Sequence, residues 1–129
     1  MSRSGTRAGV LVVDDDTAVR MVICDLLAEQ GVEVVGEAED GVEAVELAER
    51  LSPAAILLDV RMPRMNGLEA ARRIREHDGD VRVVILSAYD DAALQAEADL
   101  VGASAFLVKG CPFADVLAAV SGLEPVRGS

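Results

Sequence analysis

Short apolar runs alternate along the chain with longer stretches in which apolar residues recur every three or four positions. The runs are typical of strands, and we expect five of them, over residues 9–13, 32–36, 54–58, 81–86 and 105–108. The periodic stretches predict helices over residues 18–30, 42–51, 91–101 and 113–120, with another between Asn66 and Gly79. This alternation predicts an α/β fold, a five-stranded doubly wound parallel sheet with helices on both faces.

Residues that start and stop helices stand between the periodic stretches. Gly31 follows the first predicted helix as a left-handed stop. Asn66 is expected to cap the third helix, and Glu69 can reach back to the backbone of the cap. Asp90 is expected to cap the fourth helix, and Pro112 suits the first turn of the fifth. These signals set the boundaries of the predicted elements.

Four of the five predicted strands end in a polar residue. In chain order the strand ends carry Asp14, Asp15 and Asp16, then Asp59, then Ser87, then Lys109. Because ligands of open α/β sheets bind outside the carboxyl ends of the strands, we expect these side chains to meet at one edge. Lys109 is also the only lysine of the chain. We therefore predict a functional site at this edge.

Carboxylates gathered at one edge suit a hard divalent cation. Mg²⁺ prefers oxygen ligands and is typically bound by one or two carboxylates, water and a phosphate. Without a cation Asp14, Asp15 and Asp59 would repel one another, so we expect the site to depend on metal. With a cation, a carboxylate can attack a phosphoryl group while Ser87 and Lys109 bind its oxygens. The alternative for the acidic triplet is simple capping of the helix that follows.

Length, charge and cysteine content narrow the class of protein. The 129 residues, 51% hydrophobic, suit one domain over residues 9–122 between short tails, 1–8 and 123–129. A net charge of −11 without a basic stripe argues against direct nucleic-acid binding. Cys24 and Cys111 lack metal-ligand spacing and suit reduced thiols. With no long apolar run and no signal-peptide pattern, we expect a cytoplasmic protein that does not enter membranes.

The polar strand ends lie inside motifs of a known family. The motifs are VVDDD at 12–16, LLDVRMPRMNG at 57–67, ILSA at 85–88 and GASAFLVK at 102–109. In this order and spacing the chain resembles the CheY-like receiver domain of two-component response regulators. The resemblance implies a (βα)5 flavodoxin-like three-layer sandwich. It also implies a signalling switch and not an enzyme, with Mg²⁺-dependent self-phosphorylation and self-dephosphorylation as its only reactions.

The resemblance assigns roles to individual residues. Asp59 would accept a phosphoryl group from a phosphohistidine on a sensor histidine kinase or a histidine phosphotransfer protein. Mg²⁺ would be held by Asp14, Asp15, Asp59 and the backbone carbonyl of Arg61, and Lys109 would pair with the phosphoryl oxygens.

The resemblance also implies a conformational switch. In the active state Ser87 would move toward the phosphoryl group and Phe106 would turn inward into the space released. One position departs from the common pattern, since Gly110 follows the lysine where many receivers have proline. We therefore expect a trans Lys109–Gly110 bond and a differently shaped loop, as in receivers of NarL-type regulators.

The route of the output signal stays open at the level of sequence. No output domain follows the receiver, so the chain is either a single-domain regulator or part of a longer protein. The signal would pass to a second copy or to a downstream protein target. The nearly apolar stretch 113–120 is either a well buried helix or the surface that makes this contact.

Two other functions compete with the phosphorylated switch. The first is a receiver-like module that acts through protein contacts without phosphorylation. The second is a phosphatase of the haloacid dehalogenase type, with Asp14 as nucleophile and Asp16 as acid and base. Ala18, where that class has Thr or Val, and the short chain both argue against the phosphatase.

Overall fold

The computed structural model describes residues 9–62 and 64–122, which form five β–α units in succession. The strands are β1 (Val10–Val13), β2 (Val34–Ala38), β3 (Ala55–Asp59), β4 (Arg82–Ser87) and β5 (Ala105–Val108). The helices are α1 (Thr17–Glu29), α2 (Gly41–Leu51), α3 (Gly67–His77), α4 (Ala92–Leu100) and α5 (Phe113–Ser121). The predicted tails, 1–8 and 123–129, lie outside the described residues.

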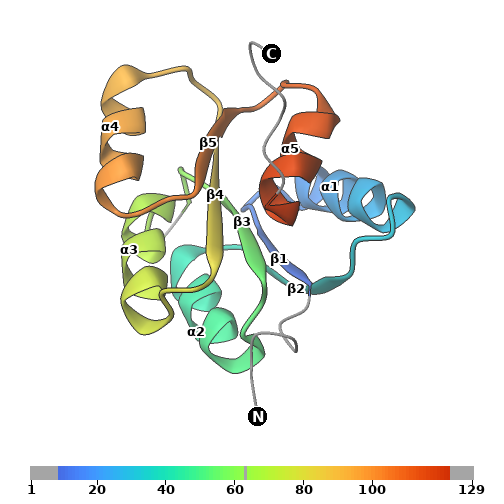
Figure 1. Ribbon diagram of the computed structural model, residues 1–129, viewed down its shortest axis with the longest axis horizontal. Helices are drawn as coiled ribbons and strands as arrows, with labels where there is room; N and C mark the ends of the chain where they lie inside the picture. The colour runs from blue at the N-terminus through green and yellow to red at the C-terminus, as the bar shows by residue number, and fades with distance from the viewer. Residues whose placement is uncertain (1–8, 63, 123–129) are drawn as a thin grey trace.

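The strands form one parallel sheet in the order β2-β1-β3-β4-β5. Helices α1 and α5 cover one face of this sheet, and α2, α3 and α4 cover the other (Figure 1). The predicted three-layer, doubly wound architecture is therefore confirmed.

Side chains of the central strands alternate between two cores. Leu11 and Ile56 pack against α2, α3 and α4, whereas Val12 and Leu57 pack against α1 and α5. All four are at most 2% exposed. Because both faces of the sheet are covered at its centre, β1 and β3 appear in the sequence as apolar runs.

The second strand begins two residues later than predicted, at Val34. The N–H of Val32 donates to the carbonyl of Leu27, with 2.9 Å between nitrogen and oxygen. This bond closes the end of α1, so Val32 belongs to the helix stop that Gly31 introduces. The first register pair between β1 and β2 is Val10 with Val34.

The fourth helix is capped by Asp91, and the predicted cap at Asp90 is wrong. The Asp91 side chain accepts the N–H groups of Ala93 and Leu94. Asp90 instead accepts a hydrogen bond from the side chain of Gln95. Two adjacent aspartates carry the same capping signal, and only the backbone conformation separates them.

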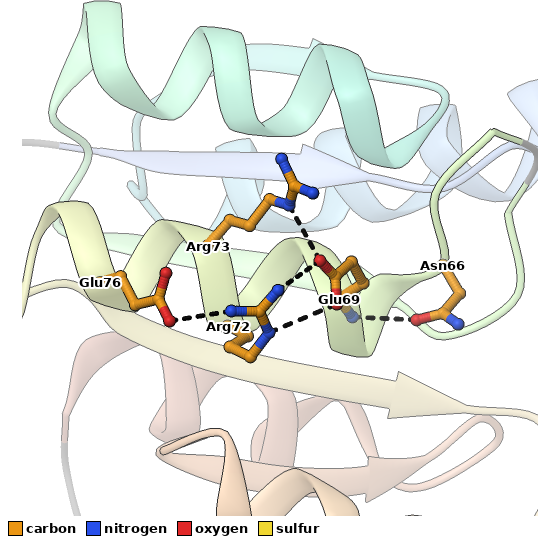
Figure 2. Close-up of polar contacts among 5 residues, drawn as sticks. All are labelled: Asn66, Glu69, Arg72, Arg73 and Glu76. Carbon is orange, nitrogen blue, oxygen red and sulfur yellow. Dashed lines mark hydrogen bonds and ion pairs between the residues drawn. The ribbon is translucent and has the colours of Figure 1, made fainter.

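The third helix begins at the predicted cap, Asn66, whose side chain accepts the N–H of Glu69. The Glu69 carboxylate, expected to reach back to the cap, instead pairs with Arg72 and Arg73 (Figure 2). Arg72 extends this chain of ion pairs to Glu76. All four charged side chains lie on the solvent side of α3, where water screens such ion pairs and makes them weak.

The fifth helix packs its apolar side on the sheet. Val116, Ala119 and Val120 are buried there, whereas Ala114 and Asp115 are exposed. Burial thus accounts for the apolar residues on the inner side of α5. Neither α5 nor any other helix within residues 9–62 and 64–122 has the length and apolar character needed to cross a membrane.

Candidate functional site

The predicted strand ends come together at the carboxyl edge of the sheet. Asp14 follows β1, Asp59 is the last residue of β3, Ser87 is the last of β4, and Lys109 follows β5. These four strands are neighbours in the sheet, so the side chains at their ends are neighbours too. The backbone continues the ladder at this edge, since the Lys109 N–H donates to the Ser87 carbonyl over 2.7 Å.

Three carboxylates share a small volume at this edge. One carboxylate oxygen from each of Asp14, Asp15 and Asp59 lies within 4.8 Å of the others. Asp14 and Asp59 are buried, at 2% and 6% exposure, while Asp15 is exposed. Charges of the same sign are thus held together, two of them with little water to screen them.

Lys109 is the cation within this group. Its Nζ lies 3.2 Å from Oδ2 of Asp14 and 3.3 Å from Oδ1 of Asp59. Burial by itself lowers the pKa of Lys109, but the charges of Asp59 and Asp14 outweigh it, so the pKa is raised. The ammonium is therefore charged at neutral pH and links β5 to β1 and β3.

Asp59 has a raised pKa. Burial is the largest cause, and the charge of Asp14 adds to it, while the charge of Lys109 and its hydrogen bond oppose both. One ammonium faces three carboxylates, so two negative charges stay uncompensated. A carboxylate in this setting gains from any further positive charge brought near it.

The donor set fits a hard divalent cation. The carboxylates line a cavity of about 280 Å³, which has room for water beside an ion. Its other lining residues are Asp16, Val19, Val60, Arg61, Ser87, Ala88, Tyr89 and Lys109. Oxygen ligands, two uncompensated negative charges and space for water are what Mg²⁺ requires.

Asp16 makes different contacts from Asp14 and Asp15. Its carboxylate accepts the N–H groups of Ala18 and Val19 and so caps α1. Capping, the alternative considered for the whole acidic triplet, therefore describes Asp16, whereas Asp14 and Asp15 point to the cluster.

Ser87 is buried, and its hydroxyl is bound to the backbone of the following loop. The hydroxyl donates to the Tyr89 carbonyl over 2.9 Å and accepts the Tyr89 N–H over 3.0 Å. Phe106 is half-buried in β5 and packs against the core beneath α3 and α4. In this structure hydrogen bonds thus hold Ser87 in place, and packing holds Phe106.

The loop after Asp59 is held from two sides. The Arg64 side chain pairs with Asp40, the cap of α2. Gly67, the first residue of α3, lies so close to the Asp59 backbone that an added Cβ would collide with it. The Lys109–Gly110 bond, on the opposite side of the site, is trans as expected.

Two features of the site were not predicted. The guanidinium of Arg61 lies over the ring of Tyr89, 5.4 Å from its centroid, and joins two loops at the cavity. Arg20, on α1, donates to the backbone carbonyl of Asp14. None of the three residues, Arg61, Tyr89 and Arg20, is a strand end, and strand ends were the signal that located the rest of the site.

Comparisons with known proteins agree with this geometry. The family model described as "Response regulator receiver domain" matches residues 10–121. The transcriptional regulatory protein PdtaR of Mycobacterium tuberculosis is 40% identical over 111 residues, which are 86% of this chain and 54% of PdtaR. The chain thus spans about half the length of this relative.

Solved structures extend the likeness to the fold. The signal receiver domain of the putative response regulator NarL from M. tuberculosis has a TM-score of 0.84 at 36% identity, over 90% of this chain and 94% of that one. A chain of the CheX-CheY-BeF3-Mg²⁺ complex from Borrelia burgdorferi has a TM-score of 0.83 at 30% identity, over 89% of this chain and 87% of that one. The chain belongs to the response regulator receiver domain family, whose members act in phosphorylation-dependent two-component signalling.

Proposed function

We propose that Asp59 is the phosphoryl acceptor of this receiver. The observation that carries the proposal is its pairing with Lys109 on the wall of the acidic cavity. Asp14 accepts hydrogen bonds on both carboxylate oxygens, from Asp16 and from Lys109. Asp59 contacts the ammonium through Oδ1, so Oδ2 stays outside that ion pair. A carboxylate held by a cation at one oxygen suits attack through the other.

The transfer is a displacement at phosphorus. A carboxylate oxygen of Asp59 attacks the phosphorus of a phosphohistidine, the new O–P bond forms, and the P–N bond breaks with its electron pair on the imidazole nitrogen. The Lys109 ammonium stabilises the negative charge of the phosphoryl oxygens. In self-dephosphorylation water attacks the same phosphorus and the bond to Asp59 breaks, which releases phosphate and the carboxylate.

We assign a Mg²⁺ site to Asp14, Asp15, Asp59 and the backbone carbonyl of Arg61. The clustered carboxylate oxygens and the place of Arg61 on the cavity wall support this assignment. A bound Mg²⁺ would neutralise charge shared by the acceptor and the incoming phosphoryl group. Asp14 and Asp15 would contribute their carboxylates from the turn between β1 and α1.

Ser87 and Phe106 are the proposed switch residues. The Ser87 hydroxyl must leave the backbone of Tyr89 before it can donate to a phosphoryl oxygen on Asp59. This movement would displace the loop after β4 and change the room available to Phe106, which lies beside β4. Phosphorylation would thus alter the surface formed by α4 and β5.

We propose a sensor histidine kinase or a histidine phosphotransfer protein as phosphodonor. A second copy of the chain or a downstream protein would receive the signal, and residues 9–122 would form the receiver unit. Cys24 and Cys111 are free thiols, which supports a reducing compartment, the cytoplasm, as the place of action.

Labelling with a small phosphodonor tests the proposal. The protein is incubated with Mg²⁺ and acetyl phosphate, and the phosphorylated form is separated on a phosphate-affinity gel. We expect labelling of the wild type, and loss of labelling in Asp59→Asn or after chelation of the metal. Asp16→Asn, which keeps a capping side chain on α1, should still be labelled. Absence of labelling in the wild type would favour the phosphorylation-independent module.

A further inference from the structure

Arg20 is a charged residue in an enclosed position. Its side chain is only 13% exposed, although it lies on α1 at the surface of the sheet. Its Nε donates to Oε1 of Glu37, in β2, over 2.9 Å, and its Nη1 donates to the carbonyl oxygen of Asp14 over 2.6 Å. Arginine is rarely enclosed unless its N–H donors are satisfied. Here the donors of Arg20 connect Glu37, in β2, with Asp14, at the end of β1.

The contact with Asp14 lies at the point where β1 ends. The N–H of Asp14 still donates to the Ala38 carbonyl of β2. Beyond this bond the chain turns toward α1, and the Asp14 carbonyl accepts from Arg20. The guanidinium therefore takes the place of a strand donor at the last position of the ladder.

Asp14 is fixed through four of its atoms. Its nitrogen is bound to Ala38, its carbonyl oxygen to Arg20, its Oδ1 to the Asp16 N–H, and its Oδ2 to Lys109. The Asp16 contact comes from the turn itself, and the other three come from β2, from α1 and from the end of β5. The contact with Arg20 sets the orientation of the planar peptide that joins Asp14 to Asp15.

We propose that Arg20, oriented by Glu37, is a positioning residue for the divalent-cation site. It holds the Asp14–Asp15 peptide so that both carboxylates face the cavity, without contacting the ion itself. The inference rests on the proposed cation site and adds an outer layer of residues to it. Such outer partners commonly change metal affinity by about 10–100-fold when they are removed.

The charge of Arg20 and its proposed positioning role predict opposite changes in Mg²⁺ affinity when the side chain is removed. As a nearby positive charge, Arg20 opposes the binding of a cation, so its removal would strengthen Mg²⁺ binding if charge alone mattered. As a positioning residue it keeps the ligands in place, so its removal would weaken binding. The direction of the change therefore separates the two roles.

The measurement is a Mg²⁺ titration followed by tyrosine fluorescence. The chain has one tyrosine and no tryptophan, and Tyr89 lines the cavity, so its emission reports on this site. We expect Arg20→Met to raise the apparent Kd for Mg²⁺ by about tenfold. Arg72→Met, which removes the same charge from the exposed side of α3, should leave the Kd unchanged.

A second variant keeps the test valid if Arg20→Met does not fold. Arg20→Lys preserves the charge, but a single ammonium lacks the planar fork that serves Glu37 and Asp14 together. Charge alone therefore predicts an unchanged Kd, whereas positioning predicts a Kd several-fold higher. At saturating Mg²⁺ both variants should regain most of the wild-type labelling rate with acetyl phosphate, since Asp59 and Lys109 are intact.

The outcomes separate this inference from the function on which it rests. A wild type that neither responds to Mg²⁺ nor is labelled would overturn the proposed cation site itself. A wild type that binds Mg²⁺, with Arg20→Met and Arg20→Lys binding equally well or more tightly, would overturn only the positioning role.

Discussion

At the scale of single residues, the fold places Asp59 in an environment that disfavours its charge. The side chain is buried beside Asp14, and one ammonium, that of Lys109, is shared between the two. The charge of Asp59, the proposed acceptor, is therefore only partly compensated by Lys109. This state suits a group that must bind a cation and then accept a phosphoryl group.

We expect Asp59→Asn to stabilise the metal-free protein at neutral pH. Burial and the charge of Asp14 raise the pKa of Asp59, so the folded state binds this proton more tightly than the unfolded chain does. The stability that Asp59 contributes is therefore greatest at low pH and falls as the pH rises through the raised pKa. In a chelating buffer, the melting temperature of Asp59→Asn should exceed that of the wild type by an amount that grows from acidic to neutral pH. A gap that is independent of pH would contradict this explanation.

We expect the ring of Tyr89 to limit access to the site. It lies against Arg61 at the cavity, and an exposed cation–π contact contributes about 0.5–1 kcal/mol. Tyr89→Ala removes this contact and should accelerate labelling by acetyl phosphate about twofold to fivefold. Tyr89→Phe keeps the ring and serves as the matched control, which should label at the wild-type rate. Equal rates in all three proteins would show that the ring does not restrict entry.

At the scale of elements, a helix or strand boundary was predicted more accurately when several adjacent residues indicated it than when a single residue did. The strands β1, β3 and β4 were predicted within one residue and β5 at its observed bounds, because an apolar run forms most or all of each strand. Single-residue signals were less reliable. Asp90 and Asp91 offered the same cap, and Val32 was apolar enough to suggest a strand although it closes α1.

We expect Gly67→Ala to destabilise the protein although it places alanine in a helix. An added Cβ at Gly67 would collide with the backbone of Asp59, so the two segments must separate. The expected loss is about 1–3 kcal/mol in the free energy of unfolding by urea, as for other overpacked sites. Gly79→Ala is the matched control, because an added Cβ there meets no neighbour. A variant of Gly67 as stable as that control would show that the contact can relax.

At the scale of the whole molecule, topology explains how much of the site could be predicted. Asp14, Asp59, Ser87 and Lys109 were found because parallel strands bring their carboxyl ends to one edge, whatever the loops do. Arg20 and the Arg61–Tyr89 pair were not, because their contacts depend on loop conformation and on which backbone group a long side chain reaches. Hydrophobic periodicity shows which side of a helix is buried but gives neither kind of information.

We expect Mg²⁺ to stabilise the whole domain, because an ion that binds only the folded state shifts the unfolding equilibrium. At an ion concentration of a hundred times Kd the gain is about 2.7 kcal/mol. Asp15→Asn should lose most of it, since Asp15 belongs to the carboxylate cluster. Asp25→Asn, which makes the same change at an exposed position on α1, should keep the gain. The same gain from NaCl at equal ionic strength would contradict a specific site.

The most direct test of the central claim is to identify the residue that carries the phosphoryl group. After reaction with acetyl phosphate and Mg²⁺, borohydride reduces the acyl phosphate to homoserine, and peptide mass spectrometry locates the change. We expect homoserine at position 59, and its disappearance when Mg²⁺ is withheld. Homoserine at position 14 or 15, or at no position in a protein that binds Mg²⁺, would contradict it.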